Sequence, residues 1–150
     1  MINLISDTIT KPTAPMLAAM MQAEVGDDVF GTDPSVNALE AQAAALFGKE
    51  AALFCPSGTM TNQIALKTHT QPMEEVICDE KSHIFQSEVG GYAFHSGIAV
   101  NLLRGENGIV DAEMVRKAIR PIADWQPKTS LVMGTGRQSG TIFSANNQRR

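Results

Sequence analysis

The sequence lacks the features that would place this protein in a membrane, outside the cell or on nucleic acid. No apolar stretch approaches the roughly 20 residues that a helix needs to span a bilayer. The N-terminus has no basic region followed by an apolar run, so we expect no secretory signal. The net charge is -4 and no basic stripe is present to neutralise phosphates, which argues against nucleic acid as a partner. We therefore expect a soluble protein of the cytoplasm.

Cysteine is scarce as well, since Cys55 and Cys78 are the only two in 150 residues. Two cysteines do not build a disulfide framework, and neither stands at a spacing typical of metal ligands, so we expect no metal site. The hydrophobic fraction of 43% and the charged fraction of 19% are ordinary for a globular protein. Most of the chain is therefore expected to bury a core rather than remain disordered.

What is present is an alternation of helical and strand-like segments. The second helix is the best defined, because Asp33 suits its N-cap, Pro34 its first position and Gly48 its left-handed end. Helices are predicted over 14–23, 34–47, 59–69, about 82–90 and 111–119, and strands over 51–54, 76–78, 98–103 and 130–133. Strands that alternate with helices predict an α/β fold, with a mostly parallel sheet covered by helices on both faces.

The turn Pro56–Thr59 lies between a predicted strand and a predicted helix. Gly58 allows close approach of a ligand to the backbone, and the helix start supplies free N–H groups and a positive dipole end. Thr59 adds a hydroxyl donor, so the turn can bind a phosphate. An ordinary turn before a helix explains the same residues equally well.

His83 follows the predicted strand at 76–78. Ligands of open α/β sheets bind beyond the carboxyl ends of strands, so His83 and Gly58 can share one crevice. There a histidine can stack on a flat heterocycle or move a proton. A surface histidine that caps a helix is the alternative.

The N-terminal stretch from Ser6 to Thr10 carries three hydroxyl groups close together. Such a group suits a carboxylate ligand, and it suits a simple extended arm equally well. From composition alone, the arm is the preferred interpretation.

Four segments together resemble the threonine aldolase family of β-eliminating lyases, which are type I pyridoxal-phosphate enzymes. They are SDTIT, EVGDDVFGTDPSVNALE, FGKEAALFCPSGTMTNQIAL and EEVICDEKSHIFQSEVGG. The resemblance runs in order from Leu4 to about Val132. SDTIT and GDDVFG favour the aldolases over other type I lyases and over serine hydroxymethyltransferase-like proteins.

The resemblance implies an incomplete pyridoxal-phosphate-dependent transferase-like large domain over 14–143, with an arm at 1–13 and a frayed tail at 144–150. The implied reaction cleaves a small β-hydroxy-α-amino acid, L-threonine or L-allo-threonine, to glycine and acetaldehyde. Such a lyase belongs to threonine catabolism and glycine biosynthesis, and the family implies a homotetramer.

The resemblance also implies roles for individual residues. Gly58 and Thr59 would bind the phosphate of pyridoxal 5'-phosphate, and His83 would stack on its pyridine ring and assist proton transfer. Ser6 would bind the substrate carboxylate. The loop that carries Asp27, Asp28 and Phe30 would lie near a subunit interface.

The sequence departs from the family pattern at three places. Ile5 stands where the family usually has arginine, and Phe30 replaces a usual tyrosine and so loses a hydroxyl donor. The stretch Gly134–Ser139 does not resemble the expected segment, although the following Gly140–Phe143 does. The stretch Gly134–Ser139 and the unpatterned tail favour a fragment or a disrupted reading frame.

The resemblance places the Schiff-base lysine and the aspartate on the pyridine nitrogen beyond residue 150. We interpret the lysines of this chain as surface charges: Lys11, Lys49, Lys67, Lys81, Lys117 and Lys128. The acidic residues Asp79, Glu80 and Glu88 are interpreted as surface carboxylates, and the Gly-Gly turn after Glu88 can place this residue near the crevice. We therefore expect a truncated, inactive and poorly soluble chain with an exposed sheet edge. The alternative is a short protein that binds a phosphate or a partner without enzymatic activity.

Overall fold

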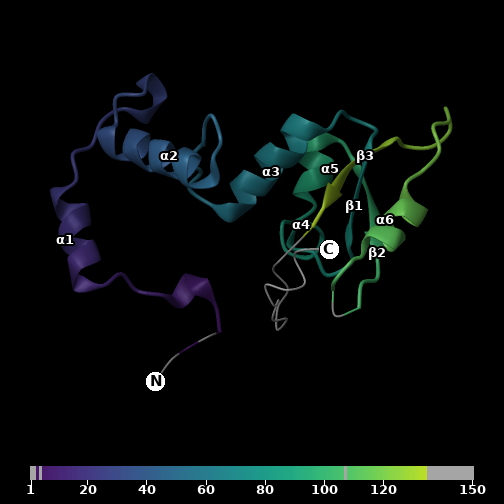
Figure 1. The fold of residues 1–150 in the computed structure, drawn as a ribbon, viewed down its shortest axis with the longest axis horizontal. Helices are drawn as coiled ribbons and strands as arrows, with labels where there is room; N and C mark the ends of the chain where they lie inside the picture. Colours follow the sequence, from purple (N-terminus) through teal and green to yellow (C-terminus); the bar gives the residue numbers. More distant parts are fainter. Residues whose placement is uncertain (1–2, 4, 107, 135–150) are drawn as a thin grey trace. The chain divides into compact units, whose positions relative to one another are not determined.

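The computed structural model describes residues 3, 5–106 and 108–134, and the chain divides into two compact units, Met1–Phe54 and Cys55–Arg150 (Figure 1). The predictions for 135–143 and for the tail at 144–150 lie outside the described residues. No helix within the described ranges is long and apolar enough to cross a membrane.

The N-terminal unit contains two short 3-10 turns and two α-helices. These are η1 (Asp7–Ile9), α1 (Ala14–Gln22), η2 (Asp28–Phe30) and α2 (Pro34–Phe47). The capping prediction for α2 is confirmed, because the Asp33 carboxylate accepts the backbone N–H groups of Ser35 and Val36. Gly48 ends this helix in the left-handed conformation at φ 61°. Local capping therefore accounts for both ends of α2.

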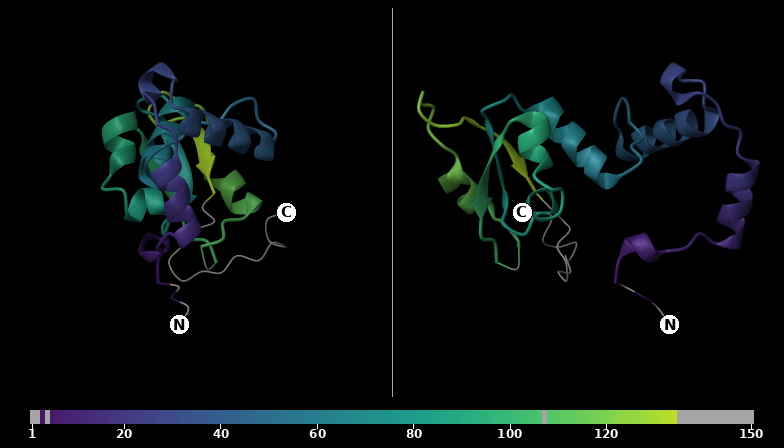
Figure 2. Two further views of the ribbon diagram at one scale, coloured as in Figure 1. Left: turned by 90° about the vertical axis from the view of Figure 1, so that its left-hand side faces the viewer. Right: turned by 180° about the vertical axis from the view of Figure 1, so that it is seen from behind.

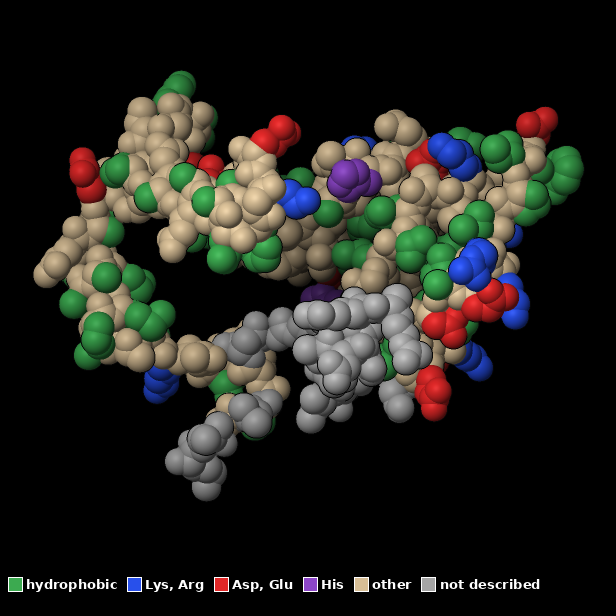
Figure 3. Space-filling model, in the orientation of Figure 1, with side chains coloured by type: hydrophobic (Ala, Val, Ile, Leu, Met, Phe, Trp, Pro, Cys, Tyr) green, Lys and Arg blue, Asp and Glu red, His purple; other side chains and the backbone are tan. Residues whose placement is uncertain are grey.

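Neither α1 nor α2 buries a residue. Their large apolar side chains are open to solvent, and Figure 3 shows hydrophobic groups gathered over both helices. Among them, Met21 is 86% exposed and Leu46 is 77% exposed. Helices owe most of their stability to the packing of an apolar face, and here these faces remain uncovered.

The C-terminal unit is a three-stranded parallel sheet with helices on both sides. Its strands are β1 (Glu75–Asp79), β2 (Ala99–Leu103) and β3 (Thr129–Met133), in the spatial order β2-β1-β3. Its helices are α3 (Gly58–His69), α4 (His83–Gln86), α5 (Gly91–Ser96) and α6 (Ala112–Ala118). In Figures 1 and 2, α6 lies on one side of the sheet and α3, α4 and α5 lie on the other. This confirms the predicted α/β class with a parallel sheet covered on both faces.

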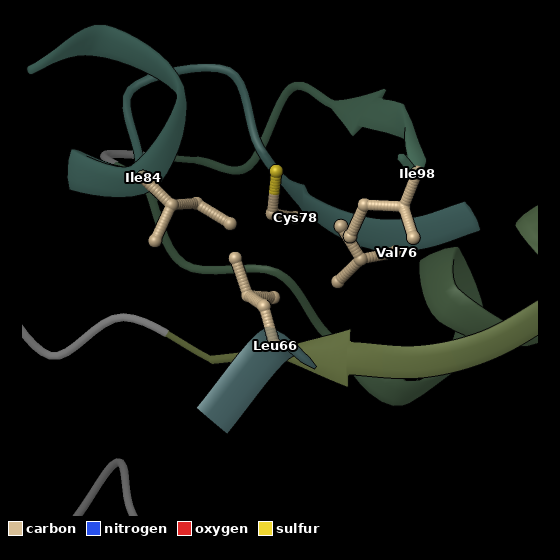
Figure 4. Close-up of a cluster of buried hydrophobic side chains, with 5 residues drawn as sticks. All are labelled: Leu66, Val76, Cys78, Ile84 and Ile98. Atoms are coloured by element: carbon tan, nitrogen blue, oxygen red, sulfur yellow. The ribbon is translucent and has the colours of Figure 1, made fainter. Parts of the chain in front are cut away.

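The core of this unit lies between β1 and the helices α3 and α4. Figure 4 shows Leu66 pointing from α3 toward Val76, Cys78 and Ile84, with Ile98 beside them. Each of these side chains is at most 4% exposed. Burial of an aliphatic side chain of this size contributes about 1.5–3 kcal/mol. Cys78 is thus a core residue, and its burial raises the pKa of the thiol.

The predicted strand at 51–54 is wrong. Leu53 is 68% exposed and Phe54 is 47% exposed, and the backbone N–H of Phe54 donates to the Glu40 side chain over 2.7 Å. A strand needs a neighbouring strand to take up its backbone groups, and here a side-chain carboxylate accepts one of them.

The prediction that the chain leaves helical structure at Gly90 is also wrong. The short helix α4 ends at Gln86, and α5 begins at Gly91 directly after Gly90, whose φ is 72°. Gly90 has the left-handed conformation and is the N-cap of α5, so this glycine precedes a second helix instead of ending helical structure.

Candidate functional site

Two of the predicted site segments lie toward the same edge of the sheet. The strands are parallel, so they all end at one edge, where β1 finishes at Asp79 and α4 begins four residues later at His83. Helix α3 packs on the sheet through Leu66 and is joined to β1 by the short loop 70–74, so its first turn points back toward that edge. This is where ligands of parallel α/β sheets bind.

The first turn of α3 is open. Ser57 caps it, with its hydroxyl oxygen accepting the N–H of Met60 over 3.1 Å. In the part of the chain that the structure describes, no acceptor takes the N–H of Gly58 or Thr59. A methyl group placed on Gly58 would meet no atom within 4 Å, and φ at this glycine is not in the left-handed region. The backbone therefore does not require glycine, and its small size keeps the helix start accessible.

His83 is joined to α3 by a buried carboxylate that the sequence did not reveal. Nδ1 of His83 lies 2.8 Å from Oε1 of Glu88, and the Nδ2 amide of Asn62 donates to the same oxygen over 2.6 Å. The Nε2 amide of Gln63 donates to the other carboxylate oxygen, also over 2.6 Å. We call Asn62, Gln63, His83 and Glu88 the Glu88 cluster. Asn62 lies one helical turn after Gly58 on α3, so the shared carboxylate holds His83 close to the start of that helix.

Glu88 is therefore not the surface carboxylate that we predicted. Its side chain is completely buried, whereas the His83 side chain is 45% exposed. Burial raises the pKa of Glu88, but the hydrogen bonds from Asn62, His83 and Gln63 outweigh it and hold the pKa below the ordinary value. The carboxylate is thus ionised at neutral pH. The sequence signal that could have marked it is the pair of adjacent amides, Asn62 and Gln63, in the middle of α3.

Asp79 is also buried, at 3% exposure, so its interpretation as a surface carboxylate is wrong as well. Its side chain accepts the N–H of Lys81 over 2.9 Å and the N–H of Gly105 over 2.8 Å. These bonds shape the turn between β1 and His83 and tie it to the end of β2. Glu80 is half-buried and pairs with the exposed Arg104 over 2.9 Å.

Ser6 and the loop around Phe30 belong to the N-terminal unit. The Ser6 hydroxyl lies 2.8 Å from the Thr8 hydroxyl and accepts the N–H of Thr8. The Asp27 carboxylate accepts the N–H of Val29, and Phe30 is 79% exposed. The role of Ser6 at a substrate carboxylate stays a prediction.

The lysines occupy surface positions, as predicted: Lys11, Lys49, Lys67, Lys81, Lys117 and Lys128 are all exposed. Lys117 and Lys128 pair with Glu113 and Glu74, respectively. Across the described ranges, no three His, Cys, Asp or Glu side chains are grouped as metal ligands are.

The C-terminal unit has an α/β fold with a parallel sheet, and comparison with solved structures gives the same fold. A threonine aldolase of Leishmania major superposes with a TM-score of 0.65 over 79% of this chain and 34% of that one, at 23% sequence identity. The model of the beta-eliminating lyases matches residues 3–150. The chain belongs to the beta-eliminating lyase family.

Two of its curated relatives are named as threonine aldolases. The low specificity L-threonine aldolase of Escherichia coli K12 is 45% identical over 144 residues, which are 95% of this chain and 43% of that protein. Low-specificity L-threonine aldolase 1 of Arabidopsis thaliana is 42% identical over 87% of this chain and 38% of its own length. The chain thus spans less than half the length of these curated relatives. Beta-eliminating lyases and threonine aldolases depend on pyridoxal phosphate.

Proposed function

We propose that this chain forms the phosphate-binding and ring-binding side of a threonine aldolase active site. The observation that carries the proposal is an open helix start at Gly58 on the helix whose Asn62 shares the buried Glu88 carboxylate with the half-exposed His83. The names of the relatives support the assignment. The proposed reaction cleaves L-threonine or L-allo-threonine to glycine and acetaldehyde.

The residues present fit pyridoxal phosphate. An anion at the start of α3 would take hydrogen bonds from the N–H groups of Gly58 and Thr59 and from the Thr59 hydroxyl, and would gain from the helix dipole. The exposed part of the His83 ring would lie against the flat pyridine ring and exchange a proton with the reacting atoms. Ser6 would bind the substrate carboxylate. When bound, the cofactor withdraws electrons from the bond that is cleaved.

The same proposal assigns the protein to the cytoplasm and to a homotetramer, as the family resemblance implies. It assigns no lysine of these 150 residues to the cofactor, because none stands at the position that the family resemblance gives to the Schiff-base lysine. A polypeptide of only these residues is therefore proposed to be inactive as an aldolase.

A second candidate is a binding protein for a phosphate-bearing ligand without lyase activity. The feature that favours it is the open start of α3, which can bind an anion without any lysine nearby. The two candidates differ in whether carbon–carbon cleavage follows binding.

A chimaera tests the proposal directly. Residues 4–132 of this chain would replace the matching part of the Escherichia coli relative, which supplies the remainder of the fold. We expect glycine and acetaldehyde from L-threonine, and loss of most of this activity on His83→Ala. A chimaera that folds and binds pyridoxal phosphate but releases no glycine would favour the binding protein instead.

A further inference from the structure

The protonation of His83 follows from its contact with Glu88. An ionised carboxylate has acceptor oxygens only, so the 2.8 Å contact between Nδ1 and Oε1 requires the proton to be on Nδ1. In a neutral imidazole the other nitrogen, Nε2, then carries a lone pair. The Glu88 carboxylate bound at Nδ1 is fully buried, whereas the His83 side chain is 45% exposed.

We propose that Glu88 is a positioning residue that holds His83 as the Nδ1–H tautomer and so leaves Nε2 as the proton acceptor on the open side of the ring. The inference rests on the proposed function in one respect, namely that the open side of His83 faces the cofactor. A proton taken up at Nε2 gives an imidazolium next to the Glu88 carboxylate. Its release restores the neutral ring with Nδ1–H unchanged, so Glu88 is never protonated in the transfer.

The carboxylate is fixed independently of His83. Asn62 and Gln63 donate to its two oxygens from α3, over 2.6 Å each, so one helix holds Glu88 and the carboxylate in turn orients the histidine of another. Gly91 contributes to this, because a methyl group there would come within 2.8 Å of the Gln63 side chain. The small residue at the start of α5 lets the amide of Gln63 reach the carboxylate. Glu88 therefore sets the orientation of the His83 ring, because the position of its carboxylate does not depend on the contact with His83.

The tautomer can be read by NMR without any catalytic activity. The protein is labelled with 15N-histidine, and long-range proton–nitrogen correlations are recorded at neutral pH. The chain has three histidines, and the His83 signals are assigned with His83→Asn. We expect a protonated Nδ1 and an unprotonated Nε2 in the unaltered protein. A protonated Nε2 with a bare Nδ1 would overturn the proposal, whatever the variants do.

Two variants and one control separate positioning from simple stability. Glu88→Ala removes the acceptor, and we expect the Nδ1 proton preference to be lost. Glu88→Gln keeps one acceptor oxygen and should restore the preference at least in part. Glu80→Gln changes the nearby Arg104 pair and should leave the His83 signals unmoved. The His69 and His95 signals report whether each variant is folded, and an unchanged tautomer in a folded Glu88→Ala would contradict the proposal.

Added pyridoxal phosphate distinguishes this inference from the function on which it rests. If His83 has the Nδ1–H form but none of its signals shifts with the cofactor, the positioning role stands and the proposed function fails. If the signals shift while Nε2 carries the proton, the proposed function stands and the role of Glu88 fails.

Discussion

Arg120 and Glu75 join the loop after α6 to the first residue of the central strand. Nε of Arg120 donates to Oε2 of Glu75 over 2.8 Å, while Thr129 and Asn101 donate to the other oxygen. The Glu75 side chain is 1% exposed. This pair lies at the amino end of the strands, opposite the edge that carries His83. It therefore contributes to stability at a place remote from the proposed site.

Glu75→Gln should make the protein less stable and less sensitive to acid. Burial raises the pKa of Glu75, but the hydrogen bonds from Thr129, Arg120 and Asn101 outweigh it, so the pKa lies below its ordinary value. The ionised carboxylate thus stabilises the fold above the ordinary carboxyl pKa, and this stabilisation is lost as the pH falls toward the lower folded-state pKa. We expect a loss of about 1–3 kcal/mol at neutral pH and a smaller loss in acid.

Urea unfolding followed by circular dichroism at pH 7 and in acid measures this difference. Glu113→Gln is the control, because Glu113 pairs with Arg116 and Lys117 on the exposed face of α6. It should change the free energy of unfolding by less than about 0.5 kcal/mol. An equal loss for Glu75→Gln at both pH values would refute the role given to its charge.

Gly58→Ala should weaken cofactor binding without weakening the fold. The added methyl group meets no protein atom within 4 Å, so it occupies only the space that the phosphate would use. Pyridoxal is the matched control, because it lacks the phosphate and its binding should not depend on Gly58. Equilibrium dialysis with pyridoxal phosphate and with pyridoxal measures the effect in the variant and in the unaltered protein. Equal binding of pyridoxal phosphate by both proteins would argue against a phosphate site at α3.

Gly91→Ala should disturb the Glu88 cluster. Its methyl group would lie 2.8 Å from Cδ of Gln63, which is buried and bonded to Glu88, so overpacking is expected to cost about 1–3 kcal/mol. Gln63→Ala in the same chain removes the clashing atoms. The loss of the double variant should therefore be smaller than the sum of the two single losses, and a simple sum would show that no such clash exists.

The exposed apolar face of α1 should affect self-association more than stability. Met20 is 66% exposed and Met21 is 86% exposed, so replacing both by Gln should cost less than about 0.5 kcal/mol. The same change should reduce association in light scattering, because exposed apolar patches drive it. Leu66→Ala in the core is the comparison and should cost about 2–5 kcal/mol. A large loss of stability from the methionine changes would mean that α1 is buried.

The sequence predicts the elements whose ends are set by neighbouring residues. Asp33, Pro34 and Gly48 are all local signals, and α2 has the predicted bounds. The predicted strand at 51–54 is absent, because a strand needs a neighbouring strand and local composition does not show whether one is available. Helix α5 was not predicted, because the glycines at 90 and 91 are typical of a helix end. Instead, α5 begins at Gly91, which packs against Gln63 on α3.

The positions of the candidate site segments follow the sequence in part, and the roles of their residues stay predictions. Gly58, Thr59 and His83 stand in recognisable segments, and the structure brings these segments to one edge of the sheet. The burial of Glu88 was not predicted, since its donors Asn62 and Gln63 lie more than 20 residues away in the chain. A charged residue before two glycines looks exposed until the donors that make its burial favourable are known.

The central claim is that the first turn of α3 and His83 together bind one cofactor. The most direct measurement is an NMR titration with pyridoxal phosphate that follows the backbone amides of Gly58 and Thr59 and the ring of His83. We predict that these signals shift together and with one apparent affinity, while the amides of α6 stay unchanged. Shifts of His83 without Gly58 and Thr59, or no shift at either place, would contradict the account.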